Sequence, residues 1–144
     1  MLEYCYVMVK PGYANNLELV DFVKEELKSL GLEIIKGSMV LYDTESAKLH
    51  YIAKAKEDYY QELTDYITSD YSYGMILKGE DAIANARAKV QELRISLKSK
   101  FNLETDLTKN ILHCTSKMKI GDKLVDIDSN REIQIFSKLV KRLI

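Results

Sequence analysis

The residue whose type and position most clearly suggest chemistry is His113. It lies in the stretch KNILHCTS, residues 109–116, after two apolar residues and before a cysteine and two hydroxyl side chains. A neutral imidazole nitrogen is a good nucleophile near pH 7. A histidine that only makes structural hydrogen bonds at a strand end would show the same pattern. The same structural explanation applies to His50, the second of the two histidines. Taken alone, the pattern leaves both interpretations open.

Two cations and a group of tyrosines are further candidates. Lys10 ends an apolar run just before a proline–glycine turn, where a side chain leaves a sheet and can point into a cleft. Arg87 borders the apolar face of a predicted helix, so its guanidinium group can be held in one direction rather than moving freely in solvent. Tyr51, Tyr59 and Tyr60 form an aromatic group. A solvated lysine, an arginine whose stem lies along the surface and tyrosines that pack in a core explain the same features.

Composition bounds the class of protein. A chain of 144 residues fits one domain, residues 1–144, with a sizeable core. With 21 basic and 22 acidic side chains, it lacks the basic excess expected of a general nucleic-acid or membrane-surface binder. No apolar run approaches the length of a membrane span. Cys5 and Cys114 fit no metal spacing, and without a signal peptide they predict reduced thiols and a cytoplasmic location.

Motifs of several enzyme classes are missing from the sequence. The six glycines are scattered singly, so there is no glycine-rich loop to cradle phosphates. No zinc-ligand spacing and no serine–histidine–aspartate signature occur. The sequence therefore gives no argument for acyl transfer.

Strands and helices alternate along the chain. Runs rich in β-branched and aromatic residues predict strands at 4–9, 32–42, 71–79 and 110–114. Apolar residues spaced by three and four predict helices at 17–30, as two short segments within 44–67, at 80–93 and at 131–144, with an irregular stretch at 94–108. This order predicts an α+β ferredoxin-like sandwich, in which helices cover one face of a four-stranded antiparallel sheet. That fold hosts many functions and does not choose one.

In their chain order, the candidates resemble the nucleoside diphosphate kinase family from about residue 4 to residue 137. The stretches that carry the resemblance are YVMVKPG (6–12), HYIAKAKEDYYQEL (50–63), MILKGEDAIANARAKV (75–90), KNILHCTS (109–116) and REIQIF (131–136). The resemblance implies that His113 becomes phosphorylated. It further implies that the nucleotide is bound by Lys10, Tyr51, Tyr59, Leu63, Arg87, Lys100 and Asn110, and that the histidine is supported by Thr115 and Glu132.

The same resemblance implies the activity and the partners. The γ-phosphate of a nucleoside triphosphate would move to His113 and then to a nucleoside diphosphate. Mg²⁺ is the implied cofactor, held mainly by the nucleotide phosphates and water rather than by protein ligands. The family implies a homo-oligomer. Neither a membrane nor a nucleic acid is expected as a partner.

The chain departs from the family pattern at several positions. Gly12 and Tyr13 replace a usual aspartate, Leu93 replaces a threonine and Cys114 replaces a glycine. The loop before the histidine strand is shorter, and residues 119–127 form an insertion. Lys100 falls near the place of a second arginine, where a lysine neutralises phosphate but makes no planar bidentate contact. Two alternatives therefore stay open: a nucleotide-binding domain with weak or no phosphotransfer, and a ferredoxin-like regulatory or RNA-binding module.

Overall fold

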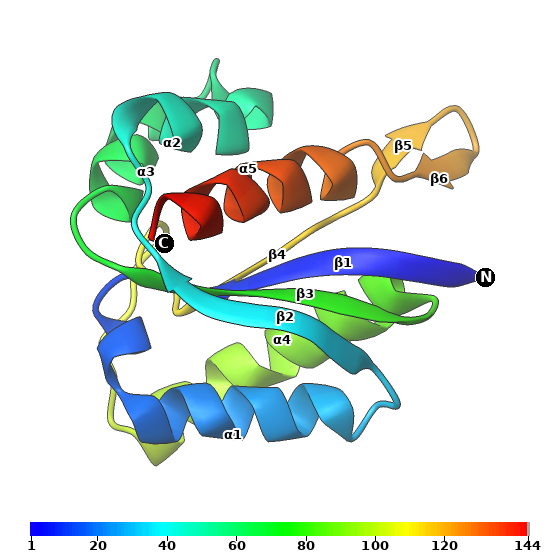
Figure 1. Cartoon of the computed structure of the whole chain (residues 1–144), viewed down its shortest axis with the longest axis horizontal. Helices are drawn as coiled ribbons and strands as arrows, with labels where there is room; N and C mark the ends of the chain where they lie inside the picture. Colours follow the sequence, from blue (N-terminus) through cyan, green and yellow to red (C-terminus); the bar gives the residue numbers. More distant parts are fainter. Residues whose placement is uncertain (144) are drawn as a thin grey trace.

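A four-stranded antiparallel sheet runs through the middle of the protein, as seen in this computed structural model, which describes residues 1–143 (Figure 1). The strand order is β2-β3-β1-β4. The strands are β1 (Leu2–Val9), β2 (Glu33–Val40), β3 (Ser72–Glu80) and β4 (Leu112–Cys114). The predicted α+β ferredoxin-like fold is confirmed.

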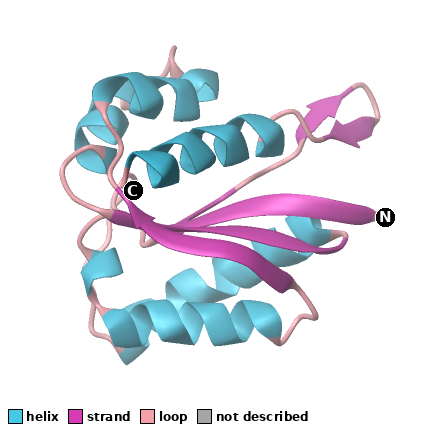
Figure 2. Ribbon diagram, viewed as in Figure 1, coloured by secondary structure: helices cyan, strands magenta, loops and turns pink. Residues whose placement is uncertain are grey.

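Helices cover both faces of this sheet, not one as predicted (Figures 1 and 2). The helices are α1 (Leu17–Lys28), α2 (Thr44–His50), α3 (Tyr60–Ile67), α4 (Ala82–Lys100) and α5 (Ser129–Arg142), with short 3₁₀ turns at Tyr13–Asn15 and Ile52–Lys54. Helices α1 and α4 lie on one face, and α5 lies on the other with α2 and α3 beyond it.

Strand β1 carries the physical reason for this two-sided cover. Cys5, Val7 and Val9 are fully buried in the core under α1 and α4. Tyr6 and Met8 are fully buried in the second core, under α5. An uninterrupted apolar strand marks a sheet that is covered on both faces, because successive side chains point to opposite sides.

Helix α4 is longer than predicted, so residues 94–100 are helical rather than irregular. Leu97 is fully buried and continues the apolar stripe of Ile83, Ala86, Val90 and Leu93 by one more turn. The additional turns of the helix include a cation, Arg94.

The insertion after β4 forms a hairpin, which the sequence did not predict. Strands β5 (Met118–Ile120) and β6 (Lys123–Val125) pair around a turn in which Gly121 has a φ of +63°. The hairpin projects beyond the main sheet near the start of α5 (Figure 1). Its apolar side chains are exposed, which explains why no buried strand pattern signals it.

The remaining boundaries differ by a few residues. The Asn16 side chain caps α1, accepting a hydrogen bond from the Leu19 amide at 3.1 Å. The fourth strand begins two residues later than predicted, because Ile111 has a φ of +76°. The last helix begins at Ser129, and Ile144, included in the prediction, lies outside the described residues. Within residues 1–143, no helix combines the length and the apolar character that crossing a membrane requires.

Gly74 on β3 sets how closely α5 packs on the sheet. A Cβ at this position would lie 2.6 Å from the Phe136 ring and 2.5 Å from the Tyr6 hydroxyl. Both rings are fully buried, so neither can move aside easily. The close approach of α5 thus requires a glycine at residue 74.

We expect Gly74→Ala to lower the free energy of unfolding by about 1–3 kcal/mol, because overpacking a filled core forces rings and backbone to shift. Gly37→Ala is the matched control. Its Cβ would meet first the hydroxyl end of half-buried Tyr73, which can move. Urea denaturation of both variants measures the difference, and equal losses would contradict the packing argument.

Candidate active site

His113 occupies the middle of β4, the edge strand beside β1. Its neighbours Leu112 and Cys114 point into the core under α1 and α4, so the alternation of the strand turns His113 toward α5. There its Nε2 lies 2.9 Å from Oε2 of Glu132. The His113 side chain is 18% exposed, so it can still be reached from solvent.

Glu132, in the first turn of α5, is buried and fully engaged. Its second oxygen, Oε1, accepts a hydrogen bond from the Thr115 hydroxyl at 2.6 Å, and that hydroxyl oxygen accepts one from the Tyr6 amide at 3.0 Å. Burial alone raises the pKa of Glu132, but the His113 ring and the Thr115 hydroxyl outweigh it and hold the pKa well below its usual range.

An ionised Glu132 can only accept a hydrogen bond, so His113 Nε2 carries the ring proton and donates the bond. The other ring nitrogen, Nδ1, then keeps its lone pair. The carboxylate thereby selects the tautomer and fixes the ring orientation, as a carboxylate behind a catalytic histidine does in other enzymes. Nδ1 is the atom that can act as a nucleophile.

A hollow of about 320 Å³ opens in front of His113 and Glu132. Its lining contains three cations, Lys54, Lys117 and Arg131. Arg131 is paired with Asp128 at 2.9 Å and Lys117 with Glu3 at 2.6 Å. Sequence analysis singled out none of these three, because their proximity depends on how α2, α5 and the segment after β4 meet.

Lys10 lies beside this histidine strand and is buried. Its Nζ donates to Oδ1 of Asn110 at 2.7 Å and to the carbonyl of Thr108 at 3.1 Å, so the structure brings together two residues predicted to bind nucleotide. Burial, together with the charge of Arg94, lowers the pKa of Lys10 to about 7, and Asp106 opposes this only in part. The ammonium lacks a direct carboxylate partner among the described residues.

Arg94 is a residue that sequence reasoning missed. Its Nη2 donates to the carbonyl of Leu112, the residue before His113, at 2.8 Å. Burial and the charge of Arg87 lower the pKa of Arg94. The signal in the sequence was its spacing: seven residues after Arg87, it lies on the same side of one helix. Ending the predicted helix at residue 93 hid that relation.

Of the other predicted site residues, only some line the hollow in front of His113. Tyr51 lines the hollow, with its ring centroid 6.1 Å from that of His113. Leu63 is buried and Tyr59 half-buried in the core beneath α5, and neither lines the hollow. Arg87 is exposed in a neighbouring hollow that shares Lys117 with the first.

Lys100 is not brought to His113. It is exposed in the last turn of α4, with its ammonium 5.2 Å from the ring centroid of Phe22 on α1 and 5.8 Å from that of Phe101. Because α4 continues through residue 100, the lysine is carried to the end of a helix rather than into a loop over the site.

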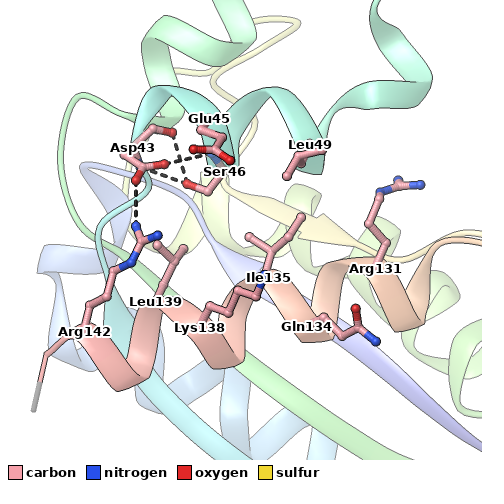
Figure 3. A pocket seen from close by; sticks show the side chains of 10 residues that line it. All are labelled: Asp43, Glu45, Ser46, Leu49, Arg131, Gln134, Ile135, Lys138, Leu139 and Arg142. Atoms are coloured by element: carbon pink, nitrogen blue, oxygen red, sulfur yellow. Dashed lines mark hydrogen bonds and ion pairs between the residues drawn. The ribbon is translucent and has the colours of Figure 1, made fainter.

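A second hollow lies between α2 and α5 (Figure 3). Two of its charged groups already satisfy one another: Arg142 pairs with Asp43 at 2.6 Å, and Asp43 caps α2 in a capping box with Ser46. Neither histidine nor cysteine lines it. The hollow in front of His113 is therefore the better candidate for chemistry.

Comparison with known proteins agrees on one family. The family model described as nucleoside diphosphate kinase matches residues 3–137. A nucleoside diphosphate kinase of Listeria monocytogenes serotype 4a (strain HCC23) is 28% identical over 141 residues, covering 94% of this chain and 88% of that protein. One of Methanobrevibacter smithii is 26% identical over 136 residues, covering 92% of this chain and 90% of that protein.

Solved structures share the fold. The Aquifex aeolicus nucleoside diphosphate kinase superposes with a TM-score of 0.74 at 22% identity, covering 94% of this chain and 95% of that one. A halophilic nucleoside diphosphate kinase from Halobacterium salinarum, solved in complex with CDP, gives a TM-score of 0.68 at 24% identity, with coverage of 94% and 88%.

The buried Lys10 predicts a pH dependence of stability. Its pKa is about 7 in the folded protein and 10.5 as the ordinary value. Between these values the unfolded chain holds a proton that the folded protein has released, so stability rises with pH. We expect the free energy of unfolding of the wild type, relative to Lys10→Met, to rise by about 1–2 kcal/mol from pH 7 to pH 9.

Urea denaturation across this pH range measures the difference. The exposed Lys100→Met is the control, and its difference from the wild type should stay flat. A difference that is equally flat for Lys10→Met would show that Lys10 keeps its proton.

Proposed function

The chain belongs to the nucleoside diphosphate kinase family of phosphotransferases, and we propose that His113 carries the phosphate from a nucleoside triphosphate to a nucleoside diphosphate. One observation carries this proposal: the hydrogen bond that His113 Nε2–H donates to buried Glu132, which leaves the Nδ1 lone pair available. A nucleophile held on a strand has a fixed direction, which in-line phosphoryl transfer requires.

The proposed reaction has two symmetrical halves. Nδ1 attacks the γ-phosphorus, the Nδ1–P bond forms, and the bond from phosphorus to the bridging oxygen breaks, so that a nucleoside diphosphate leaves. The ring then carries a phosphate on Nδ1 and the proton on Nε2, and the carboxylate of Glu132 balances its positive charge. A second nucleoside diphosphate takes the phosphate by the reverse steps, and His113 returns to its first state.

Cations beside β4 support the binding of the phosphates. The charge of Arg87 lowers the pKa of Arg94, and the charge of Arg94 lowers the pKa of Lys10. Mutually repelling cations that lack carboxylate partners are stabilised when an anion enters between them. We assign Lys10 and Arg94 to charge neutralisation at the transferring phosphate, with Asn110 holding Lys10 in place. Arg87 is placed further out.

Mg²⁺ would accompany the nucleotide rather than occupy a protein site of its own. The carboxylates that line the hollow are already engaged, Glu132 by His113 and Thr115, and Asp128 by Arg131. A donor set without a free carboxylate fits an ion whose oxygen ligands come from phosphates and water. When bound, the ion neutralises charge on the phosphates, while Lys10 and His113 act as described above.

Tyr51, Tyr59 and Leu63 are assigned to the base. Tyr51 lines the hollow, which supports a direct contact. Tyr59 and Leu63 form the apolar support behind it, since they pack in the same core as Tyr51. Stacking on an aromatic ring tolerates every base, because each base offers a π-face.

The proposal also covers the domain organisation, the assembly, the location and the class of the protein. We propose that residues 1–144 act as one domain, because the described residues pack on the two faces of one sheet. The edge strand β2, with its exposed residue Ile35, supports assembly with further copies of the chain. The thiols of Cys5 and Cys114, free and buried 3.7 Å apart, support a reducing compartment, the cytoplasm. The family match favours the enzyme over a nucleic-acid-binding module.

We expect His113→Ala to abolish the covalent phosphoenzyme, because it removes the ring nitrogen that Glu132 orients. Incubation with ATP labelled at the γ-phosphate, followed by separation at neutral pH, measures the bound label. The exposed Lys100→Ala should label as the wild type does. Label that persists on His113→Ala at a comparable rate would overturn the assignment.

Arg94→Ala should lower turnover about 10²–10³-fold, because it removes a cation next to the strand that carries the nucleophile. Steady-state phosphate exchange between ATP and a second nucleoside diphosphate measures the effect. Lys100→Ala removes a cation that lies over the ring of Phe22 on α1, and turnover should stay within about twofold of the wild type. An equal loss in both variants would exclude a specific role of Arg94.

A further inference from the structure

His50, at the end of α2, is a buried polar group with no evident purpose in phosphoryl transfer. It is 2% exposed, and neither ring nitrogen has a hydrogen-bond partner among the described residues. Its ring packs against those of Tyr42 and Tyr51, with centroids 5.4 and 4.6 Å away. Leaving a buried polar group unpaired destabilises the folded protein, so a ligand at this position would be favourable.

The nearest candidate partners of His50 belong to the active site. The rings of His50 and His113 meet edge to face, with centroids 4.5 Å apart. One ligand atom from each of His50, His113 and Glu132 lies within 4.8 Å of the other two. The three residues come from α2, β4 and α5, so packing of the folded chain assembles the cluster.

We propose that His50, His113 and Glu132 form a binding site for a divalent transition-metal ion, and that Zn²⁺ is the ion that fits it. Two imidazoles and one carboxylate are a ligand set typical of zinc, whereas Mg²⁺ prefers oxygen ligands. Ligands of tetrahedral zinc, at about 2.0–2.2 Å, lie about 3.3–3.6 Å apart, so the cluster contracts on binding.

The protonation states suit a metal ion. Burial, with the charge of His113, lowers the pKa of His50 to about 3, so its imidazole stays neutral, which is the form that binds metals. Glu132 stays ionised, because the His113 ring outweighs the effect of burial on its pKa. The fourth coordination position opens toward the hollow, where Lys54 and Lys117 favour an anion or a water as the last ligand.

Zinc at this site blocks the nucleophile, a consequence that rests on the proposed function of His113. If zinc binds Nε2, the ring proton moves to Nδ1 and the attacking lone pair is lost. If zinc binds Nδ1, the metal itself occupies that lone pair. Binding at either nitrogen thus stops phosphoryl transfer, and removing the zinc restores it.

Zinc binding is tested without reference to activity. The wild type, freed of metal, is titrated with Zn²⁺ in competition with a chromophoric chelator, in the presence of excess Mg²⁺. We expect one zinc per chain. His50→Phe keeps the ring shape but removes both nitrogens, and Glu132→Gln removes the charge; each should weaken zinc binding at least tenfold. The double variant Cys5→Ala with Cys114→Ala should bind zinc as the wild type does.

Urea denaturation shows whether each variant is folded. His50→Phe removes unpaired nitrogens and should be at least as stable as the wild type, and Glu132→Gln is the second, independent variant. The proposal is overturned if the wild type binds no stoichiometric zinc. It is also overturned if both ligand variants keep the wild-type affinity, or if the cysteine double variant loses zinc binding.

A second measurement separates this inference from the proposed function. With Mg²⁺ in excess in every labelling reaction, labelling of the wild type by γ-phosphate-labelled ATP should fall in proportion to zinc occupancy, and it should return once EDTA has stripped the zinc and has itself been removed. Labelling that is unaffected at full zinc occupancy overturns the block. A metal-free wild type that never labels contradicts the proposed function, while the zinc titration still decides the metal site.

Discussion

The hydrogen bond between His113 and Glu132 ties the edge of the sheet to α5, and much of the site depends on it. Burying a carboxylate costs several kcal/mol unless its oxygens are satisfied. Glu132 meets this requirement with one bond to His113 and one to Thr115, whose hydroxyl also receives the amide of Tyr6. A single buried charge thereby connects β1, β4 and α5, fixes the tautomer of the histidine and sets the rotation of α5 about its axis.

The four strands of the main sheet were predictable because each carries its own signal, whereas the β5–β6 hairpin was not predicted. The run of residues from Tyr4 to Val9 predicts a buried strand without any knowledge of its neighbours in the fold. The Asn16 cap marks the start of α1. The two-sided cover could also have been inferred, since an unbroken apolar strand needs partners on both faces. The length of α4 was missed because the sequence ISLKSK has only two apolar residues, Ile95 and Leu97. Ile95 is exposed, and only the burial of Leu97 in the core with α1 and β4 completes the stripe.

The candidate site was predictable where its members share a motif or match the family pattern. Asn110 and His113 lie on one short stretch, and Lys10 meets Asn110 because β1 and β4 are paired neighbours. For the opposite reason, Arg94 was not singled out from the sequence and His50 was considered but given no role. Each reaches the site from a helix whose length or packing direction is decided by distant contacts, which a single sequence does not display.

The brevity of β4 has a consequence for the timescale on which the site exists. Three residue pairs join β4 to β1, whereas eight join β1 to β3. Short edge strands belong to the parts of a protein that open locally, at free energies below that of global unfolding. The attacking nitrogen is therefore carried by one of the least protected strands of the sheet, while its lysine neighbour extends from the best protected one. We therefore expect local opening of β4, rather than global unfolding, to set how long the catalytic geometry persists. The packing of α5 against β4 through Glu132 slows that opening.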